Sequence, residues 1–285
     1  MNPRFHINYS RLMKMSLKYR QLITDGSRRI VVKIGTRVLA QSTGRPDIRR
    51  IKALASQIAR LRRDGHEVLF ITSGAIGAGM EALGMKKRPT HLPDLQMAAA
   101  VGQCRLMSRY DKLFTALGCK VGQILLTHDD FHHKMRMTNI SRTLENLIRN
   151  GVIPIINEND VVADEEIRAD MSLGDNDYLA SLVVKLTRAD LLVMLTTVDG
   201  LREHASNGTS RRVKYIESIS SKTFALVKAG SSKLSKGGML SKLKAAQSVS
   251  KAGCYSIIAD GRQKDILTRI MKGDDVGTII LASGF

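Results

Sequence analysis

Short runs of β-branched and aliphatic residues, separated by stretches long enough for a helix, constrain the fold of this chain more than any other feature. The first run covers residues 29–36 and the second covers residues 67–71. A helix-like pattern runs between them from Ile48 through Leu61, so the two strands should be parallel with a right-handed crossover. A further run, residues 152–156, is apolar throughout, which is typical of a strand buried in a parallel sheet. The sequence therefore predicts an α/β protein.

The same alternation continues along the chain. A long helix is predicted over residues 95–117, with an interruption near Gly102, and further elements follow. These are a strand at 121–126, helices at 140–148 and 177–185, and strands at 191–195, 255–259 and 276–280. We find no internal repeat and no linker between separate domains.

Composition limits the class of protein. The chain has 285 residues, of which 43% are hydrophobic, enough for one large α/β domain or two small ones. No apolar run approaches the about 18 residues that span a bilayer, so no membrane association is expected. The three cysteines, Cys104, Cys119 and Cys254, are scattered without pair spacing. This favours reduced thiols in the cytoplasm and argues against a metal site.

The excess of basic residues raises the question of nucleic-acid binding. The formal net charge is +19 at pH 7. However, aromatic residues make up only 4% of the chain, and it has no tryptophan, no RNA-recognition signature and no zinc-ligand spacing. We therefore expect no nucleic-acid partner. Polyanionic substrates such as nucleoside triphosphates would benefit from the same positive potential.

Two clusters of acids and amides follow the buried run at residues 152–156. The first is Asn157-Glu158-Asn159-Asp160 and the second is Gly174-Asp175-Asn176-Asp177. Ligands of open α/β sheets bind outside the carboxyl ends of the strands, so these side chains are placed for a small polar substrate. Asn and Asp are also ordinary turn formers, and a plain loop remains the alternative.

Three other segments contain small residues, and two of them also carry lysines. Lys33-Ile34-Gly35-Thr36 ends the first strand and can aim an ammonium and bare backbone N–H groups at a phosphate. Residues 72–79 form a glycine-rich turn after the second strand, and residues 231–242 form a basic flexible loop before a helix from Leu240 to Ala252. The simpler alternatives are helix packing for the glycines and a solvated surface for the basic loop.

Together these segments define a cleft with both signs of charge. This set of lysines, glycine-rich backbone and carboxylates suits phosphoryl transfer. In that reaction cations stabilise the phosphoryl oxygens and carboxylates orient the cations. If the acceptor is itself a carboxylate, it is already ionised at pH 7 and needs no general base. That agrees with the lack of a credible histidine base.

Seven motifs, in unbroken order over residues 30 to about 281, carry a resemblance to a known family. They are Val32-Lys33-Ile34-Gly35-Thr36, Thr72-Ser73-Gly74-Ala75-Ile76, Ala100-Val101-Gly102-Gln103, Gly122-Gln123-Ile124-Leu125-Leu126-Thr127, Ile156-Asn157-Glu158-Asn159-Asp160, Gly174-Asp175-Asn176-Asp177 and Gly237-Gly238-Met239. On these motifs the chain resembles the amino acid kinase family. The resemblance implies a three-layer αβα sandwich with a mostly parallel central sheet.

The two acid-amide motifs mark a subgroup of that family. The resemblance implies phosphorylation of the γ-carboxylate of L-glutamate by ATP, which gives L-glutamyl 5-phosphate in the first step of proline biosynthesis. By the same resemblance, Lys33 and Lys242 grip the transferring phosphoryl group and Asp177 holds the two lysines. The residues that would bind glutamate are Ser73, Asp160, Asn176 and, nearby, Asn157. The ATP site would be lined by Lys33, Gly35, Thr196, Thr197, Lys236, Gly237, Gly238, Met239 and Lys242.

The resemblance also implies how the chain is organised. Residues 1–28 would be a basic N-terminal extension, and residues 29–285 would be the kinase domain. Within that domain, residues of about 29–189 would form the amino-acid-binding lobe and residues of about 190–285 the nucleotide-binding lobe. Members use ATP with Mg, which is expected to be held mainly by ATP phosphates rather than by a protein metal site. They assemble as dimers or tetramers, and functional coupling to glutamyl phosphate reductase is one further expected partnership.

Some positions depart from the family pattern. Arg37 stands where the family usually has a small Ser or Asn, Thr197 replaces the usual Asp, and Ser235-Lys236 replaces Gly-Thr. Residues 168–172 resemble a short insertion, and the chain stops where many members continue into a PUA domain. All three substitutions lie on the nucleotide side. They leave open a degenerate member that senses glutamate or proline, or that binds polyanions.

Overall fold

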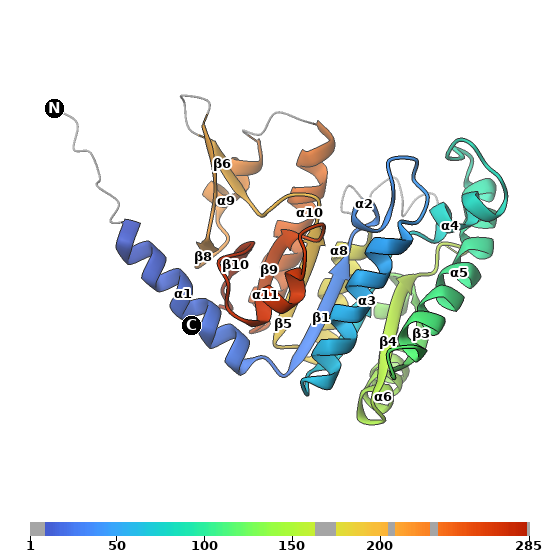
Figure 1. Cartoon of the computed structure of the whole chain (residues 1–285), viewed down its shortest axis with the longest axis horizontal. Coiled ribbons are helices and arrows are strands. Elements are labelled where there is room, and N and C mark those ends of the chain that lie inside the picture. The colour runs from blue at the N-terminus through green and yellow to red at the C-terminus, as the bar shows by residue number, and fades with distance from the viewer. Residues whose placement is uncertain (1–8, 163–174, 205–208, 229–232, 284–285) are drawn as a thin grey trace.

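The computed structural model describes residues 9–162, 175–204, 209–228 and 233–283. They form an eight-stranded sheet in the order β3-β4-β2-β1-β5-β9-β10-β8 (Figure 1). Neighbouring strands are parallel except β9 and β10, which are antiparallel. The strands are β1 (Arg29–Ile34), β2 (Glu67–Ile71), β3 (Lys120–Leu126), β4 (Val152–Glu158), β5 (Leu191–Thr196), β8 (Tyr215–Ile216), β9 (Tyr255–Asp260) and β10 (Thr278–Ile280).

Helices connect these strands, and a small hairpin of β6 (Arg202–His204) and β7 (Ser210–Arg212) stands apart from the main sheet (Figure 1). The helices are α1 (Tyr9–Gly26), α2 (Thr36–Leu39), α3 (Ile48–Arg63), α4 (Ala75–Ala82), α5 (Leu92–Thr115), α6 (Lys134–Arg149), α8 (Asp175–Thr187), α9 (Ser221–Lys228), α10 (Lys233–Ser250) and α11 (Ile266–Met271). A 3-10 turn, η1, covers Asp129–Phe131.

Alternate residues of the central strands pack into two separate cores. Val32 of β1 faces a core that contains Ile58 of α3, whereas Val31 faces a core that contains Val183 of α8 and Val249 of α10. Successive side chains of a strand point to opposite faces, so a strand that is buried throughout needs helices on both sides. This arrangement confirms the predicted three-layer αβα sandwich.

Two local expectations were wrong. Helix α5 runs through Gly102 without a break. The glycine instead leaves room for α4, which approaches closely at this point. A Cβ at Gly102 would lie 1.8 Å from the carbonyl oxygen of Ala75, and one at Gly79 would lie 1.8 Å from that of Ala98. The second concerns residues 231–242, which were expected to form a loop. Helix α10 begins at Lys233, so this segment is helical from there onward. The expected insertion at 168–172 lies outside the described residues.

The sheet positions the site at its carboxyl edge. Lys33 of β1 pairs in register with Ile71 of β2 and with Met194 of β5, so all three strands end at the same level. The segments that follow these strands therefore converge, as expected for a parallel sheet. The two predicted lobes share this one sheet, and their boundary remains a prediction.

Candidate active site

A buried carboxylate between two buried ammonium groups forms the centre of the site. Asp177 Oδ1 accepts a hydrogen bond from Lys33 Nζ at 2.6 Å, and its Oδ2 accepts one from Lys242 Nζ at 3.0 Å. The Ser241 hydroxyl also donates to Oδ2, at 2.6 Å. The side chains of Lys33, Lys242 and Asp177 are 7%, 9% and 2% exposed. Three donors thus satisfy one carboxylate that water barely reaches.

The local structure explains why these groups meet. Lys33 follows Val31 by two residues along β1. Both side chains therefore point to the same face of the sheet, which α8 and α10 cover. Asp177 lies in the first turn of α8, where a negative charge is stabilised by the helix dipole. Lys242 lies within α10, which packs against α8. Three elements far apart in sequence therefore bring the charges together.

The electrostatics of this cluster depend on the balance between burial and charge. Burial alone would raise the pKa of the Asp177 carboxyl, but the charges of Lys33 and Lys242 lower it to about 2. Burial lowers the pKa of Lys242, and the charge of Lys33 acts in the same direction, while Asp177 opposes both. The carboxylate is therefore ionised at neutral pH, and it is what keeps two ammonium groups close together inside the protein.

One side of the cluster opens into a cavity of about 420 Å³. Its polar and cationic wall includes Lys33, Arg37 and Lys242, and its apolar wall includes Val198 and Leu226. A pocket of this volume with a few convergent polar groups has the size of a nucleotide or cofactor site. Of the residues predicted to line the nucleotide site, the cavity is lined by Lys33, Gly35, Thr196, Thr197, Gly238, Met239 and Lys242.

The other side opens into a smaller cavity of about 290 Å³. All the residues predicted to bind the amino acid line it, namely Ser73, Asn157, Asp160 and Asn176. Residues 74–77 also line it, so the glycine-rich segment both faces this cavity and, at Gly79, serves helix packing. Lys33 and Thr36 line both cavities. The ammonium of Lys33 is therefore placed where the two cavities meet.

Amide side chains form the floor of the smaller cavity. Asn176 Nδ2 donates to Ser73 Oγ at 2.6 Å and to the carbonyl oxygen of Thr72 at 3.0 Å. Asn157 Nδ2 donates to Gln103 Oε1 at 2.9 Å. Asn176 Oδ1 and Gln103 Nε2 are buried without a hydrogen-bond partner among the described residues. Asn176 lines the smaller cavity, so its unpaired acceptor suits a small ligand that carries a hydrogen-bond donor.

A sequence model of the family described as "Amino acid kinase family" matches residues 28–260. The chain belongs to the amino acid kinase family. Two similar curated proteins are both called glutamate 5-kinase. The one from Citrifermentans bemidjiense is 44% identical over 260 residues, which cover 90% of this chain and 68% of that protein. The one from Listeria monocytogenes serotype 4a is 41% identical over 257 residues, which cover 89% of this chain and 92% of that protein.

A solved structure of the same family fold agrees with the architecture. Carbamate kinase from Giardia lamblia bound to AMP-PNP superimposes with a TM-score of 0.61 at 17% sequence identity. The match covers 90% of this chain and 99% of that one. At this identity the likeness establishes the amino acid kinase fold, which agrees with the fold expected from the sequence motifs.

One expectation for this amino acid kinase was wrong, and two others are not described. The backbone N–H of Gly35 is not bare, because it donates to the carbonyl oxygen of Leu195 at 3.1 Å and extends the pairing of β1 with β5. Gly35 lines the larger cavity, but its backbone N–H is not free to donate to a phosphate. Lys236 and Gly237 lie in the first turns of α10, where side-chain positions are outside the described part of the structure.

Sequence reasoning missed three polar residues of the site. Ser241 completes the hydrogen bonding of Asp177, Arg88 lines the smaller cavity, and Gln103 holds Asn157. Gln103 lies inside one of the family motifs, which was a usable signal. Ser241 precedes Lys242 in an unremarkable run, and Arg88 ends the basic run Lys86-Lys87-Arg88, so neither is distinguished by its neighbours.

None of the helices in the described part of the chain has the length and apolar composition needed to span a bilayer. No group of three or more His, Cys, Asp or Glu side chains in the described ranges is placed to hold a metal ion.

Proposed function

We propose that this protein transfers the γ-phosphoryl group of ATP to the γ-carboxylate of L-glutamate, giving L-glutamyl 5-phosphate and ADP. This is the first step of proline biosynthesis. The observation that carries the proposal is the Lys33–Asp177–Lys242 cluster at the junction of two cavities. Curated relatives at 41% and 44% identity that are called glutamate 5-kinase support the choice of substrate.

In this proposal the larger cavity holds ATP and the smaller one holds glutamate. Lys33 and Lys242 contact the transferring phosphoryl group between them, where negative charge develops on its oxygens. Asp177 acts through the lysines, because its oxygens are already engaged by Lys33, Ser241 and Lys242. The nucleotide is contacted by Thr196, Thr197, Gly238 and Met239. The same role is proposed for Lys236 and Gly237 at the start of α10.

Charge neutralisation, rather than proton transfer, is the main task of such a site. The γ-carboxylate of glutamate has an ordinary pKa near ~4.3 and is already ionised at pH 7. It can attack the phosphorus without losing a proton, so no general base is required. The remaining obstacle is the approach of two anions. Lys33 lines both cavities and is placed to reduce it.

Mg²⁺ is expected to arrive with ATP. The donors around the larger cavity fit this mode of binding, because Asp177 is the only carboxylate among the described residues that line it and already accepts three hydrogen bonds from protein groups. The ion would then be held by phosphate oxygens and water, with which Mg²⁺ readily coordinates. When bound, it supplies further positive charge to the β- and γ-phosphates.

The amide and acid groups of the smaller cavity suit the α-amino acid end of glutamate. Asp160 is a negatively charged partner for the α-ammonium, and Asn176 Oδ1 is a buried acceptor without a protein partner among the described residues. Arg88, which lines the same cavity, offers a positive charge for the α-carboxylate. A pocket that requires the ammonium would reject dicarboxylates that lack it.

Trapping of the acyl phosphate tests the proposed function. Incubation with L-glutamate, ATP, Mg²⁺ and hydroxylamine should yield γ-glutamyl hydroxamate, because hydroxylamine captures an activated carboxyl group. Formation should depend on both glutamate and ATP. A folded protein that binds glutamate or proline but forms no hydroxamate would contradict the proposal and favour the alternative of a degenerate sensor.

Replacing Asp160 by asparagine should chiefly weaken glutamate binding. The change keeps the size of the side chain but removes the charge opposite the ammonium, so the KM for glutamate should rise about ten- to hundred-fold. The KM for ATP should stay within about two-fold, because Asp160 does not line the larger cavity. The preference for glutamate over glutarate, which lacks the amine, should shrink in parallel.

Asp129→Asn is the matched control for this prediction. Asp129 lies beyond β3, and its side chain is 55% exposed, so its removal should leave both KM values unchanged. An unaltered glutamate KM in Asp160→Asn, or an equal rise for both substrates, would contradict the role assigned to Asp160.

The proposal extends to assembly and location. Family resemblance supports a cytoplasmic homo-oligomer, either a dimer or a tetramer. The acyl phosphate product is reactive toward water, which supports functional coupling to a glutamyl phosphate reductase that would consume it. The division into an amino-acid lobe at about 29–189 and a nucleotide lobe at about 190–285 is supported by the cavity lining, because the described residues that line the smaller cavity all come from the first of these ranges.

A further inference from the structure

Helix α1 docks on the domain through a buried arginine. It lies along the end of the molecule formed by α11, β10 and β8 (Figure 1). Although most of the described residues of this helix are at least partly exposed, Arg20 is only 2% exposed and Ile23 only 1%. A buried arginine is costly unless it is paired and hydrogen-bonded, so its contacts indicate what it is there to do.

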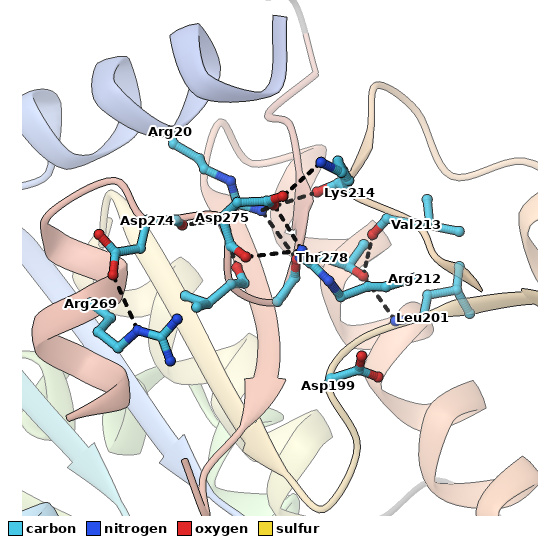
Figure 2. Close-up of polar contacts among 12 residues, drawn as sticks. Arg20, Asp199, Leu201, Arg212, Val213, Lys214, Arg269, Asp274, Asp275 and Thr278 are labelled. Carbon is cyan, nitrogen blue, oxygen red and sulfur yellow. Dashed lines mark hydrogen bonds and ion pairs between the residues drawn. The ribbon is translucent and has the colours of Figure 1, made fainter. Parts of the chain in front are cut away.

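The guanidinium of Arg20 grips the turn before β10. Its Nη1 donates to the carbonyl oxygens of Asp274 at 2.9 Å and of Val276 at 2.5 Å, and its Nη2 donates to that of Gly277 at 3.1 Å. Its Nη2 also lies 3.2 Å from Asp275 Oδ1. Figure 2 shows the guanidinium inserted against this turn. Four consecutive residues are thereby fixed by one side chain of α1.

Two further cations fix the same turn from the other side. Asp275 Oδ1 accepts a hydrogen bond from Arg212 Nη2 at 2.8 Å, and Lys214 Nζ lies 2.7 Å from Asp275 Oδ2 (Figure 2). Arg212 also donates to the carbonyl oxygens of Asp275 and Gly277. Burial lowers the pKa of Arg20 to about 10, so the guanidinium is still charged at neutral pH. The carboxylate of Asp275 is shared by all three cations and offsets part of their positive charge.

The residue that follows this turn contacts the wall of the larger cavity. Thr278 is fully buried, and its Oγ1 accepts a hydrogen bond from the backbone N–H of Leu201 at 2.9 Å while donating to the carbonyl oxygen of Val213 at 2.6 Å (Figure 2). Gly200 packs equally closely, since a Cβ there would lie 2.4 Å from Thr278 Oγ1. Gly200 and Leu201 both line the cavity.

We propose that Arg20 and Thr278 are positioning residues for nucleotide binding. Arg20 fixes the turn at 274–277. Thr278, which follows that turn, holds the cavity wall at Gly200 and Leu201 in place. The N-terminal helix is then part of the nucleotide-binding apparatus rather than a dispensable basic extension. The inference rests on the proposed role of the larger cavity as the ATP site. It goes beyond that role by assigning two residues outside the cavity.

Substitutions at Arg20 test the inference in the full-length chain. Arg20→Met should weaken binding of ADP, measured by titration calorimetry, about three- to ten-fold, and should raise the KM for ATP by a similar factor. The KM for glutamate should not change, because none of the described residues that line the smaller cavity belongs to this network. Arg20→Lys should recover part of the affinity. Lys18→Met is the matched control, since Lys18 is an exposed cation of the same helix.

Substitutions at Thr278 test the same inference independently of Arg20. Thr278→Val keeps the shape but removes the hydroxyl that holds Leu201, and it should weaken ADP binding in the same range. Thr278→Ser keeps the hydroxyl and should bind nearly as tightly as the unaltered chain. In the Arg20→Met and Thr278→Val double variant the two losses should be less than additive, because both act through one contact.

Several results would overturn the inference. They are an unchanged affinity for ADP in Arg20→Met, an equal rise in KM for both substrates, and a Thr278→Val variant that matches Thr278→Ser. If Arg20→Met does not fold, Arg20→Lys and the Thr278 pair decide the matter. ADP binding is measured without turnover, so lack of glutamate phosphorylation would count against the proposed function alone. Failure of the unaltered chain to bind ADP would overturn both.

Discussion

Replacing Lys242 by methionine is expected to lower kcat by about 10²- to 10³-fold, the usual cost of removing one group that stabilises transition-state charge. Methionine keeps a long apolar stem but carries no charge. The KM for glutamate should change little, because Lys242 lines the larger cavity and not the smaller one. A charge that acts on the transferring group affects turnover more than ground-state binding. Initial-rate kinetics with both substrates varied measure this difference.

Lys244→Met is the matched control. Lys244 lies two residues further along the same helix with an exposed side chain, and its substitution removes an equal charge from the same element. It should leave kcat within about two-fold of the unaltered chain. Equal losses of kcat in the two variants, or a loss in Lys242→Met that appears wholly in the glutamate KM, would contradict the role proposed for Lys242.

Replacing Asp177 by asparagine is expected to destabilise the fold as well as to impair turnover. The carboxylate is the shared partner of Lys33 and Lys242, both of which are buried. Asparagine is nearly the same size but leaves two ammonium groups facing each other in a poorly solvated site. Removing one member of a buried charge cluster typically costs about 3–5 kcal/mol. The free energy of unfolding, measured with urea at pH 7, should fall by an amount in this range.

The pH dependence of this loss follows from the lowered pKa of Asp177. A carboxyl whose folded-state pKa lies below its unfolded value stabilises the fold above the unfolded value. Its contribution should therefore be complete above about pH 4 and be lost as pH falls from 3.8 toward about 2. The difference in stability between the unaltered chain and Asp177→Asn should shrink over that window, as far down as the fold survives.

Asp64→Asn provides the comparison for stability. Asp64 pairs with Arg60 at 3.8 Å, but both side chains are more than half exposed. Such surface pairs contribute at most about 1 kcal/mol. If Asp177→Asn proved no more destabilising than Asp64→Asn, or if its effect were independent of pH between 4 and 2, the buried charge cluster would not be the element that we describe.

Strand positions and fold class were predictable because they follow from local patterns. The apolar runs near Ile30, Val68 and Ile153 have the period and length of buried parallel strands, and each is a strand of the central sheet. The acids and amides after β4 were predictable as a cluster for the same reason, since the end of a parallel strand lies at the ligand-binding edge. Asn157, Asp160 and Asn176 do line one cavity.

What escaped prediction depends on contacts between distant parts of the chain. The N–H of Gly35 is used by Leu195, which is remote in sequence, so no local pattern reveals that it is taken. Helix α5 was expected to break at Gly102, but the glycine instead accommodates α4. Arg20 contacts a turn 254 to 257 residues away, and no local pattern in residues 1–28 reveals this contact. Such contacts arise from tertiary packing, which the sequence does not display.

Glutamate-dependent release of ADP, compared across a panel of acceptors, tests the central claim most directly. The purified protein would be given ATP and Mg²⁺ with L-glutamate, N-acetylglutamate, a nucleoside monophosphate or no acceptor. The account predicts rapid ADP release with L-glutamate, in equal amounts to the glutamate consumed, and only background release otherwise. Release that is independent of glutamate, or faster with N-acetylglutamate or the nucleoside monophosphate, would contradict it.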